Sequence, residues 1–429
     1  MAIRWHVSLP AVAETHSKAG RPRLLVLNQY YWPGVEATAQ LLTQLCEALA
    51  QDHEVRVLTG VVRGHEGLPR RQGRNGVEVV RVPSTAFERS RLGLRALNYA
   101  TYIVGALVAG ILGPRPDLVL CMTDPPMVGA VALAVARRFG VPLVVISEDV
   151  FPEIATKLGR LENRLVVGAL RRLVQLYLKR ADRIVAIGDT MRLRLEEKGA
   201  APERIRVIPN WIDTQAVSPQ PRDNEWARKH GLVDRFVVMH SGNVGHAQNL
   251  DVLVRATTFL RDLHRLQVVI IGFGARHAHT VGLAKLLEAD AVRFLPYQPR
   301  EVLAQSLSSA DVHFVGLAKG LAGYVVPSRL YGIMAAGRPV IVAADAESET
   351  ARLVAEVGCG IVLPPGRPEL VALAIRDAYE GRLDLEEMGR RGRAYVVAQA
   401  DTRVALARYR AVLAELGDGY RAEEAAAPA

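Results

Sequence analysis

The stretch Arg23-Leu-Leu-Val-Leu-Asn28 decides the fold, together with the turn Trp32-Pro33-Gly34 that follows it. A short, continuous apolar run predicts a buried strand. Residues 36–50 come next and carry leucines at 41, 42, 45 and 49, which is the spacing of an amphipathic helix. A strand, a turn and a helix in this order predict the first unit of a parallel α/β sheet.

The same alternation continues along the whole chain. In the first half, further strands are expected at 54–58, 77–82, 118–122, 142–146, 183–187 and 204–208, with helices at 127–139 and 163–179. A second series has strands at 236–240, 267–271, 292–295, 312–315, 339–342 and 360–363. The chain is therefore expected to form two doubly wound α/β domains, which bind ligands between the carboxyl ends of their strands.

The expected domain boundaries follow from where this periodicity starts and stops. We expect a flexible leader, a first domain, a linker rich in Pro, Asp and Asn, a second domain, a final helix and a disordered tail. In the same order, these segments span residues 1–21 (leader), 22–212 (first domain), 213–226 (linker), 227–400 (second domain), 401–416 (final helix) and 417–429 (tail).

Composition limits the possible functions. Of 429 residues, 50% are apolar and 23% are charged, which excludes a disordered chain. The net charge of +10 favours an anionic partner, namely nucleic acid, a membrane surface or a phosphorylated substrate. Aromatic residues make up only 6% of the chain and no nucleic-acid-binding module is recognisable, so nucleic acid is not expected.

The cysteines and the apolar stretches indicate in which cellular compartment the protein is expected. Cys46, Cys121 and Cys359 are far apart and lie in apolar runs, so we expect no disulfide or zinc site and a cytoplasmic protein. The first twenty residues contain no secretory signal pattern. The apolar stretch 99–113 is shorter than the ~20 residues that span a bilayer, so a buried helix is expected, with contact to a membrane surface as the alternative.

Basic residues gather beside this apolar stretch. They are Arg89, Arg91, Arg95, Arg160, Arg164, Arg171, Arg172, Lys179 and Arg180. A basic face next to an apolar helix suits peripheral contact with anionic lipid, although a solvated helix face would have the same composition. We favour the membrane interpretation.

Two glycine turns follow strands of the second domain. Gly242, Asn243 and Gly245 lie in one, and Gly272 and Gly274 lie in the next. Glycine lets backbone N–H groups approach a phosphate. The spacing lacks both the Walker lysine and the full dinucleotide fingerprint, so a single nucleotide fits better than NAD. Each turn taken alone could also be a simple strand–helix connection.

The sequence Pro327-Ser328-Arg329-Leu330-Tyr331 predicts the start of a helix. A cation in the first turn of a helix is unfavourable beside the dipole. Arg329 therefore indicates a bound anion, or else a neighbouring acidic residue.

Carboxylates follow a strand of the first domain. Glu148, Asp149 and Glu153 lie at the expected carboxyl edge of the sheet, where Asp149 could orient or deprotonate a hydroxyl. Helix capping and loop solvation would use the same residues, and the sequence leaves both readings open. No histidine occurs between His65 and His230, so a histidine base from the middle of this domain is excluded.

These motifs together resemble family 4 retaining glycosyltransferases of the GT-B fold, and the nearest branch is that of bacterial colanic acid and O-antigen transferases. The motifs that carry the resemblance are at 25–59, 124–126, 148–153, 208–213, 241–245 and 327–340. The resemblance implies two Rossmann-like domains facing a central cleft, with the C-terminal helix crossing back to the first domain. It also implies that the second domain binds a nucleotide sugar and the first binds the acceptor.

The chain departs from the family pattern at two glutamates that hold the donor in many members. Tyr324 and Gly332 occupy those positions. Glu349 is our candidate for a replacement contact to the ribose or the sugar. In the first loop, Gly34 and Glu36 are expected on the acceptor side.

The resemblance also implies the mechanism. The leaving diphosphate accepts the acceptor's proton, while Arg329, Pro327, Ser328 and the turn from Gly242 to Gly245 stabilise its charge and Asp149 positions the acceptor hydroxyl. We expect a UDP-sugar, carrying an N-acetylated or deoxy hexose, as co-substrate, with no metal or other cofactor. The acceptor is expected to be a glycan or a polyprenyl-diphosphate-linked sugar at the cytoplasmic membrane surface. The alternatives are a nucleotide-sugar epimerase or hydrolase, and a non-catalytic nucleotide-sugar-binding subunit.

Overall fold

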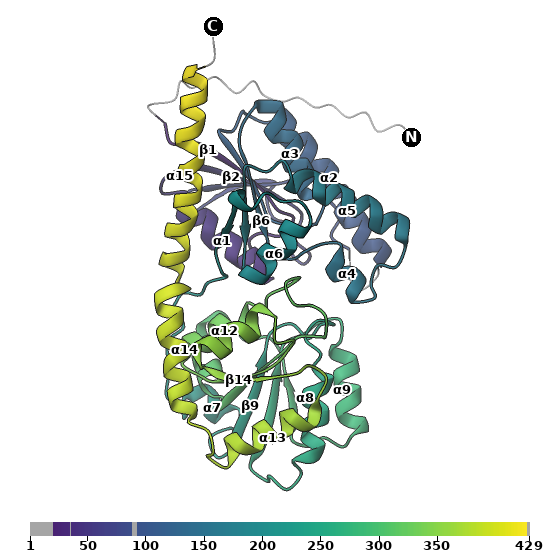
Figure 1. The fold of residues 1–429 in the computed structure, drawn as a ribbon, viewed down its shortest axis with the longest axis vertical. Coiled ribbons are helices and arrows are strands. Elements are labelled where there is room, and N and C mark those ends of the chain that lie inside the picture. Colours follow the sequence, from purple (N-terminus) through teal and green to yellow (C-terminus); the bar gives the residue numbers. More distant parts are fainter. Residues whose placement is uncertain (1–19, 35, 88–91, 427–429) are drawn as a thin grey trace.

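The structure is a computed structural model that describes residues 20–34, 36–87 and 92–426. The expected leader lies almost wholly outside this range, as do Arg89 and Arg91. The described chain forms two α/β domains, one above the other in Figure 1.

The first domain is built on an eight-stranded sheet with the order β3-β4-β2-β1-β5-β6-β7-β8. All neighbouring strands are parallel except β3 and β4. The strands are β1 Arg23–Leu27, β2 Glu54–Thr59, β3 Arg71–Arg74, β4 Val77–Arg81, β5 Leu118–Cys121, β6 Leu143–Ser147, β7 Arg183–Ala186 and β8 Ile205–Val207. The inner strands are apolar throughout because helices cover both faces of the sheet.

Helices α2, α3, α5 and α6 pack on one face of this sheet, and α1 packs on the other. The helices of the domain are α1 Ala37–Leu49, α2 Leu92–Leu112, α3 Val128–Phe139, α4 Glu153–Lys157, α5 Arg164–Leu178 and α6 Asp189–Glu197. Their C-terminal ends return the chain to the amino edge of the sheet, so the loops at the carboxyl edge are left for function.

The second domain has a six-stranded parallel sheet with the order β11-β10-β9-β12-β13-β14, which is the Rossmann order 3-2-1-4-5-6. Its strands are β9 Phe236–Ser241, β10 Leu266–Ile271, β11 Val292–Leu295, β12 Val312–Gly316, β13 Val340–Ala343 and β14 Gly360–Leu363. Its helices are α7 Glu225–Lys229, α8 Asp251–Ala256, α9 His277–Leu286, α10 Leu303–Ser308, α11 Arg329–Ala335, α12 Glu349–Val357, α13 Pro368–Tyr379 and α14 Leu385–Gln399.

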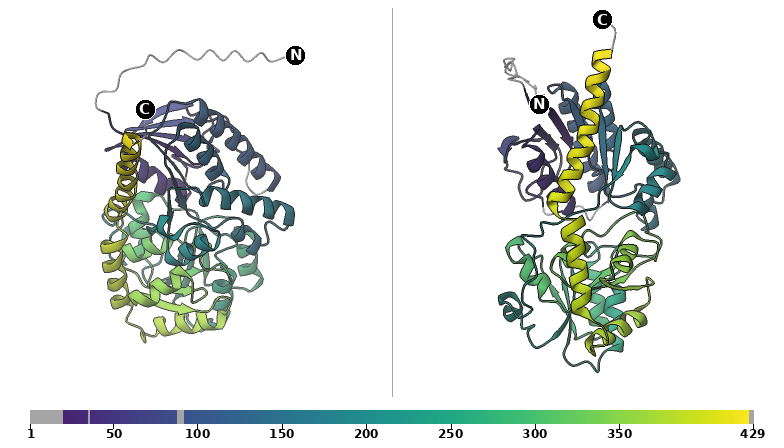
Figure 2. Two further views of the ribbon diagram at one scale, coloured as in Figure 1. Left: turned by 45° about the horizontal axis from the view of Figure 1, so that its top comes forward. Right: turned by 60° about the vertical axis from the view of Figure 1, so that its left-hand side comes forward.

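The last helix, α15 Thr402–Ala426, crosses back to the first domain. Figures 1 and 2 show it in yellow, running along the side of the molecule from the second domain to the first. Its buried residues Ala405, Tyr409, Val412, Leu413 and Leu416 belong to the core between α1 and the sheet. The crossover expected from the resemblance is therefore confirmed. The helix also continues to 426, where a disordered tail was expected from 417; its last six residues, Arg-Ala-Glu-Glu-Ala-Ala, are strong helix formers, whereas Gly417 and Gly419 are not.

The two chain crossings between the domains lie side by side. The N–H of Ile212 donates to Ala400 O at 3.0 Å, and the N–H of Thr402 donates to Ile212 O at 3.1 Å. The buried Asp401 accepts from both the backbone and the hydroxyl of Thr214. The chain therefore crosses between the domains at two segments that are hydrogen-bonded to each other.

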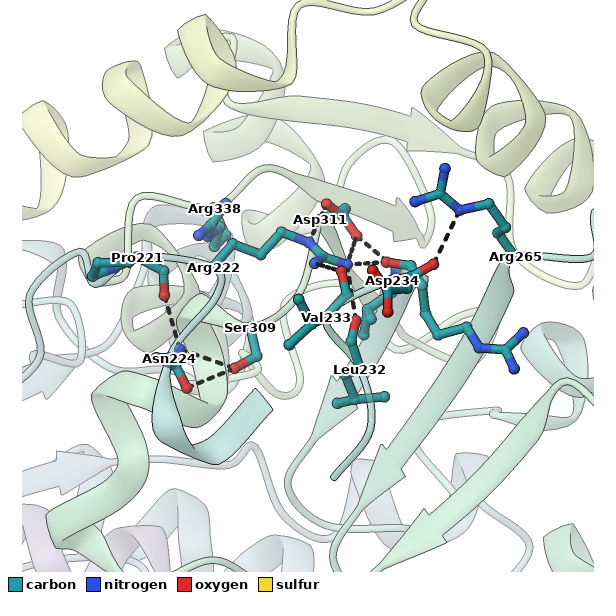
Figure 3. Close-up of polar contacts among 12 residues, drawn as sticks. Pro221, Arg222, Asn224, Leu232, Val233, Asp234, Arg265, Ser309, Asp311 and Arg338 are labelled. Atoms are coloured by element: carbon teal, nitrogen blue, oxygen red, sulfur yellow. Dashed lines mark hydrogen bonds and ion pairs between the residues drawn. The ribbon is translucent and has the colours of Figure 1, made fainter. Parts of the chain in front are cut away.

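Most of the expected linker, 213–226, is fixed to the second domain. Figure 3 shows Arg222 reaching across to Asp311, with Nε–Oδ1 and Nη2–Oδ2 distances of 2.6 and 2.9 Å. Asn224 donates to Pro221 O and Ser309 Oγ. The proline-rich composition predicted a connector, but its polar side chains bind it to the amino edge of the second sheet.

Helix α2 is longer than the expected stretch 99–113. Its segment Gly93–Leu112 is long and apolar enough to cross a bilayer, judged by length and composition alone. Tyr102 and Ala106 are nevertheless buried against the sheet, and Tyr102 Oη donates to Leu58 O at 3.0 Å. One side of α2 is thus a core element, as expected, while Val104, Val108 and Leu112 on another side are exposed.

Candidate functional site

The carboxyl edges of the two sheets meet at the domain interface. Asp149, after β6, forms an isolated antiparallel bridge with Val325 of the second domain. The N–H of Val150 donates to Tyr324 O at 2.9 Å. We call the set of loops that meet here the interdomain site.

The two glycine turns of the second domain touch each other in the interdomain site. Gly242 and Gly272 have φ angles of +139° and +124°, which are open to glycine and costly for other residues. A Cβ on Gly272 would lie 2.0 Å from Gly242 O, and one on Gly274 would lie 2.4 Å from Val244 O. Glycine is thus required for the turns to pack together, independently of any ligand.

Arg329 lies against the first of these turns. Its Cζ would be 3.3 Å from a Cβ on Gly242, and its Nη1 is 3.0 and 2.6 Å from Nδ1 and Nε2 of His240. Burial, followed by the charge of Arg329, lowers the pKa of His240 well below its ordinary value, so the imidazole is neutral. Burial also lowers the pKa of Arg329 to about 10, which leaves it charged at neutral pH.

No carboxylate forms an ion pair with Arg329 in the part of the chain that the structure describes. Among the described residues, no acidic neighbour explains the position of this arginine. A partly buried charge without a counter-ion is costly. Arg329 is accordingly placed to bind an anion at the glycine turns.

Two exposed aromatic rings beside Arg329 were missed by sequence reasoning. Phe273 and Tyr297 are each 50% exposed, their ring centroids are 6.3 Å apart, and Tyr297 Oη donates to Phe273 O at 3.2 Å. Exposed aromatic faces at a polar site suit stacking on a planar ligand group. The signal in the sequence was an aromatic residue between the two glycines of Gly272-Phe273-Gly274.

Glu148 and Asp149 lie on the facing side of the interdomain site. The side chain of Asp149 is exposed, but the protein around it displaces much of the water near the carboxylate, and this desolvation raises its pKa to about 6, with the charge of Arg95 acting in the opposite direction. Glu148 is buried, and burial raises its pKa to about 7. Its Oε2 accepts from Asn210 Nδ2 at 3.3 Å, while Oε1 has no partner.

Arg95 and Arg160 are further members of the interdomain site. Arg95 Nε donates to Tyr99 Oη at 2.7 Å, and its charge acts on Asp149. Burial and the charge of Arg160 lower the pKa of His246 in the second domain. Sequence reasoning assigned both arginines to a basic outer face, because it could not tell which side of the chain each one faces.

Other candidates occupy the rim of the site or its supporting structure. Gly34 donates its N–H to Tyr31 O at 2.8 Å, and the charge of Glu36 acts on Tyr297 across the interface. Pro327 and Ser328 lead into α11, which has only seven residues, and Ser328 makes no capping side-chain bond. Gly245 packs against the Asn243 and Gln248 side chains.

Three candidates are engaged elsewhere. Glu153 forms ion pairs with Arg171 and the buried Lys198 at 3.0 and 2.6 Å, and Tyr331 is 2% exposed in the core of the second domain. Glu349 Oε2 accepts from the backbone N and Oγ1 of Thr190, at 3.0 and 3.1 Å. The carboxylate of Glu349, predicted to hold the donor, thus ties α12 to the first domain in this structure.

Tyr324 also connects the domains. Its ring lies 5.0 Å from Lys157 Nζ and 5.0 Å from Arg194 Cζ, and it packs on the core of the first domain together with Val326. The position that carries a glutamate in many family members is thus used here for contact between domains.

Within the described ranges, no group of three or more His, Cys, Asp or Glu side chains is arranged to hold a metal ion.

Two Rossmann-like domains that meet at their carboxyl edges, joined by a helix that returns to the first domain, define the GT-B class. Residues 34–211 match the family described as "Glycosyl transferase 4-like domain", and residues 222–395 match "Glycosyl transferases group 1". Over 292 residues the chain is 31% identical to the probable glycosyltransferase WbjE of Pseudomonas aeruginosa, covering 64% of this chain and 68% of WbjE.

Two further proteins are similar over most of the chain. The putative colanic acid biosynthesis glycosyl transferase WcaI of Escherichia coli is 24% identical over 83% of this chain and 92% of its own. The crystal structure of Anabaena Alr3699/HepE in complex with UDP covers 92% of this chain and 100% of that chain, with a TM-score of 0.70 at 15% identity. The chain belongs to the family 4 glycosyltransferases of the GT-B fold, in the colanic acid and O-antigen branch, and the resemblance noted from its motifs is confirmed.

Proposed function

We propose that this glycosyltransferase moves a hexosyl group, N-acetylated or deoxy, from a UDP-sugar to a glycan or polyprenyl-diphosphate-linked acceptor, with retention of configuration, in bacterial surface polysaccharide biosynthesis. The observation that carries the proposal is the position of Arg329, a charged side chain with no acidic partner among the described residues. Its guanidinium lies at paired glycine turns without a carboxylate partner in the described chain. A diphosphate would supply the missing negative charge.

The donor's other groups have candidate partners around Arg329. Phe273 and Tyr297 offer aromatic faces for the uracil ring, and UDP is bound in the similar Alr3699/HepE structure. Stabilising the departing diphosphate with a fixed cation is electrostatic catalysis, which works because the charge needs no reorganisation during the reaction. No metal is required by this arrangement.

The acceptor would bind on the side of the first domain. Asp149 can accept a hydrogen bond from the acceptor hydroxyl and so aim its oxygen at the anomeric carbon. The hydroxyl proton passes to an oxygen of the leaving diphosphate, the bond from the acceptor oxygen to the anomeric carbon forms, and the bond to the diphosphate breaks. Arg95 and Arg160 bring positive charge to the same site, which suits an acceptor that itself carries a diphosphate.

The proposed location is the cytoplasmic face of a membrane, bound peripherally. Helices α2 and α5 expose Leu97, Val104, Val108, Leu112 and Leu165. Apolar side chains beside basic ones bind an anionic lipid surface by partial insertion and charge attraction. A lipid-linked acceptor would then lie within reach of the protein.

Thermal unfolding of the full chain with UDP, GDP, ADP or NAD, followed by product analysis, tests this function. A ligand present at a hundred times its Kd should stabilise the protein by about 2.7 kcal/mol, and we expect this with UDP alone. Mass analysis should then show sugar on the acceptor. Sugar released as the free hexose, or converted to its epimer, would contradict the proposal in favour of a hydrolase or an epimerase. UDP binding without turnover on any acceptor would indicate a non-catalytic binding subunit.

A further inference from the structure

A hollow of about 530 Å³ lies on the first domain at the amino edge of its sheet, opposite the edge that holds Asp149. It is formed where α3 and α5 end and where β6 and β7 begin. Its apolar lining consists of Leu133, Ala136, Val141 and Leu143. Its polar lining consists of Arg137, Lys179, Arg180, Arg204 and Asp182.

The charge of this hollow is unbalanced. Four cations face one carboxylate, and Asp182 Oδ2 already accepts the N–H of Leu143 at 2.8 Å. Within the described chain, no ion pair engages any of the four cations. Nearby Arg183 and Arg206, in contrast, both pair with Glu415, at 2.8 Å.

Helix dipoles explain only part of this arrangement. Arg137 lies in the last turn of α3, and Lys179 and Arg180 follow α5, where cations are favourable. Arg204 comes from a separate turn and donates to Ala181 O at 3.2 Å. The carbonyl ends of the helices repel anions, so the four side chains must supply all the attraction for an anionic ligand, and that attraction is sensitive to salt.

Exposed apolar side chains lie on helices α5 and α2. On α5, Leu176 is exposed one turn before Lys179, whereas Leu165, which is 86% exposed, and Val166 lie at the other end of the helix. On α2, Val104, Val108 and Leu112 recur every fourth residue and so share one side of the helix. Both helices pack against α3 in the same layer. The hollow thus adjoins the end of an exposed apolar helix.

We propose that this hollow binds the phosphate of an anionic phospholipid headgroup while the exposed sides of α2 and α5 lie in the bilayer surface. The inference rests on the peripheral membrane binding proposed above and adds a specific headgroup site to it. Lipid is favoured over a soluble phosphate because the exposed Leu176 lies one turn from Lys179 and the exposed sides of α2 and α5 belong to the same helical layer, and a soluble phosphate would leave those apolar side chains in water.

Sedimentation of the full chain with phosphatidylcholine vesicles, made with or without phosphatidylglycerol, tests the proposal. A cation at an anionic surface contributes roughly a fivefold gain in partitioning. The double variant Arg137→Gln/Arg180→Gln should therefore bind phosphatidylglycerol vesicles about 25-fold more weakly than the wild type. The matched variant Arg255→Gln/Arg352→Gln removes two exposed arginines of the second domain and should bind like the wild type.

Two further measurements separate the possible failures. Val104→Ser/Val108→Ser should lose binding to vesicles of either composition, whereas the Arg137/Arg180 variant should keep wild-type thermal stabilisation by UDP. If wild-type protein binds no vesicles, the proposed membrane association fails. If it binds and the Arg137/Arg180 variant binds equally well, only the headgroup site is overturned. Glycerol phosphate and chloride are compared at equal ionic strength as competitors of vesicle binding. If glycerol phosphate displaces the protein from vesicles more strongly than chloride does, the hollow binds a soluble phosphate and the lipid assignment is overturned.

Discussion

Asp149 and Arg329 both sit in surroundings that oppose their charge. Burial raises the pKa of Asp149 to about 6 and lowers that of Arg329 to about 10. Near pH 7 each remains predominantly charged, so the interdomain site presents a hydrogen-bond acceptor on one side and a cation on the other. Groups whose pKa values are shifted by burial in this way are typical of functional sites.

The pH dependence of transfer should report on Asp149. In the proposed mechanism Asp149 accepts a hydrogen bond from the acceptor hydroxyl, and the ionised carboxylate is the stronger acceptor, so kcat/KM should rise with pH up to about 6 and then level off. Asp149→Asn should lower kcat/KM by roughly 10²-fold and remove this limb of the profile. If Asp149→Asn is slower but its kcat/KM still rises with pH up to about 6, another group is responsible for the pH dependence.

Phe273 should contribute to nucleotide affinity through stacking. Removing an aromatic face that stacks on a base costs about 1–3 kcal/mol, so Phe273→Ala should weaken UDP binding by roughly 5- to 150-fold in a calorimetric titration. Phe259 is similarly exposed in the same domain, and Phe259→Ala is the matched control. Equal affinities of the two variants for UDP would exclude Phe273 from the base site.

At the scale of elements, the sequence predicted the positions of the strands well, but it predicted poorly which way the loop side chains point. β1, β6 and β13 follow from continuous apolar runs, because a strand buried on both faces has no polar positions. The same reasoning missed β3, whose sequence Arg-Gln-Gly-Arg is polar and pairs only at the sheet edge. It placed α5 within a residue at either end, because Asn163 caps the helix with its side chain.

Glu148 ties the end of β6 to Asn210 in the loop after β8, and it makes folding dependent on pH. Burial raises its pKa from 4.5 in the unfolded chain to about 7. The folded protein therefore holds a proton that the unfolded chain releases, and the free energy of unfolding falls as pH rises from about 4.5 to about 7.

Glu148→Gln should flatten this dependence. Denaturant unfolding at about pH 5 and about pH 8 should show that the variant loses less stability than the wild type, by on the order of 3 kcal/mol. Glu78→Gln is the control, since Glu78 is a half-buried partner of Arg56. Parallel pH dependences for wild type and Glu148→Gln would contradict a raised pKa at this position.

At the scale of the whole molecule, contacts between the domains use Glu349, which the sequence suggested for the donor, and Tyr324, which stands where many family members have a glutamate. Glu349 bonds to Thr190, and Tyr324 lies between Lys157 and Arg194. Such contacts could not be predicted, because they depend on how two separately folded sheets are oriented. Local pattern determines each sheet, whereas the partner of a loop side chain comes from residues distant in sequence.

Tyr324→Ala should loosen the domain interface. The ring makes cation–π contacts with two side chains, each worth about 0.5–1 kcal/mol at a partly exposed position. Amide hydrogen exchange at Val150, whose N–H is bonded to Tyr324 O, should accelerate by roughly 5- to 30-fold. Tyr324→Phe keeps the ring and should exchange like the wild type. Unchanged exchange in Tyr324→Ala would mean that the Tyr324 ring does not stabilise the backbone bridge between the domains.

The central claim is that Arg329 binds the donor's diphosphate, and a calorimetric titration of UDP into wild-type and Arg329→Ala protein tests it most directly. Hydrogen bonds to a charged group contribute about 1.5–3 kcal/mol, so we predict that Kd for UDP rises by roughly 10- to 150-fold. Arg255→Ala, an exposed arginine of the same domain, should bind like the wild type. A folded Arg329→Ala protein that binds UDP with wild-type affinity would contradict the claim.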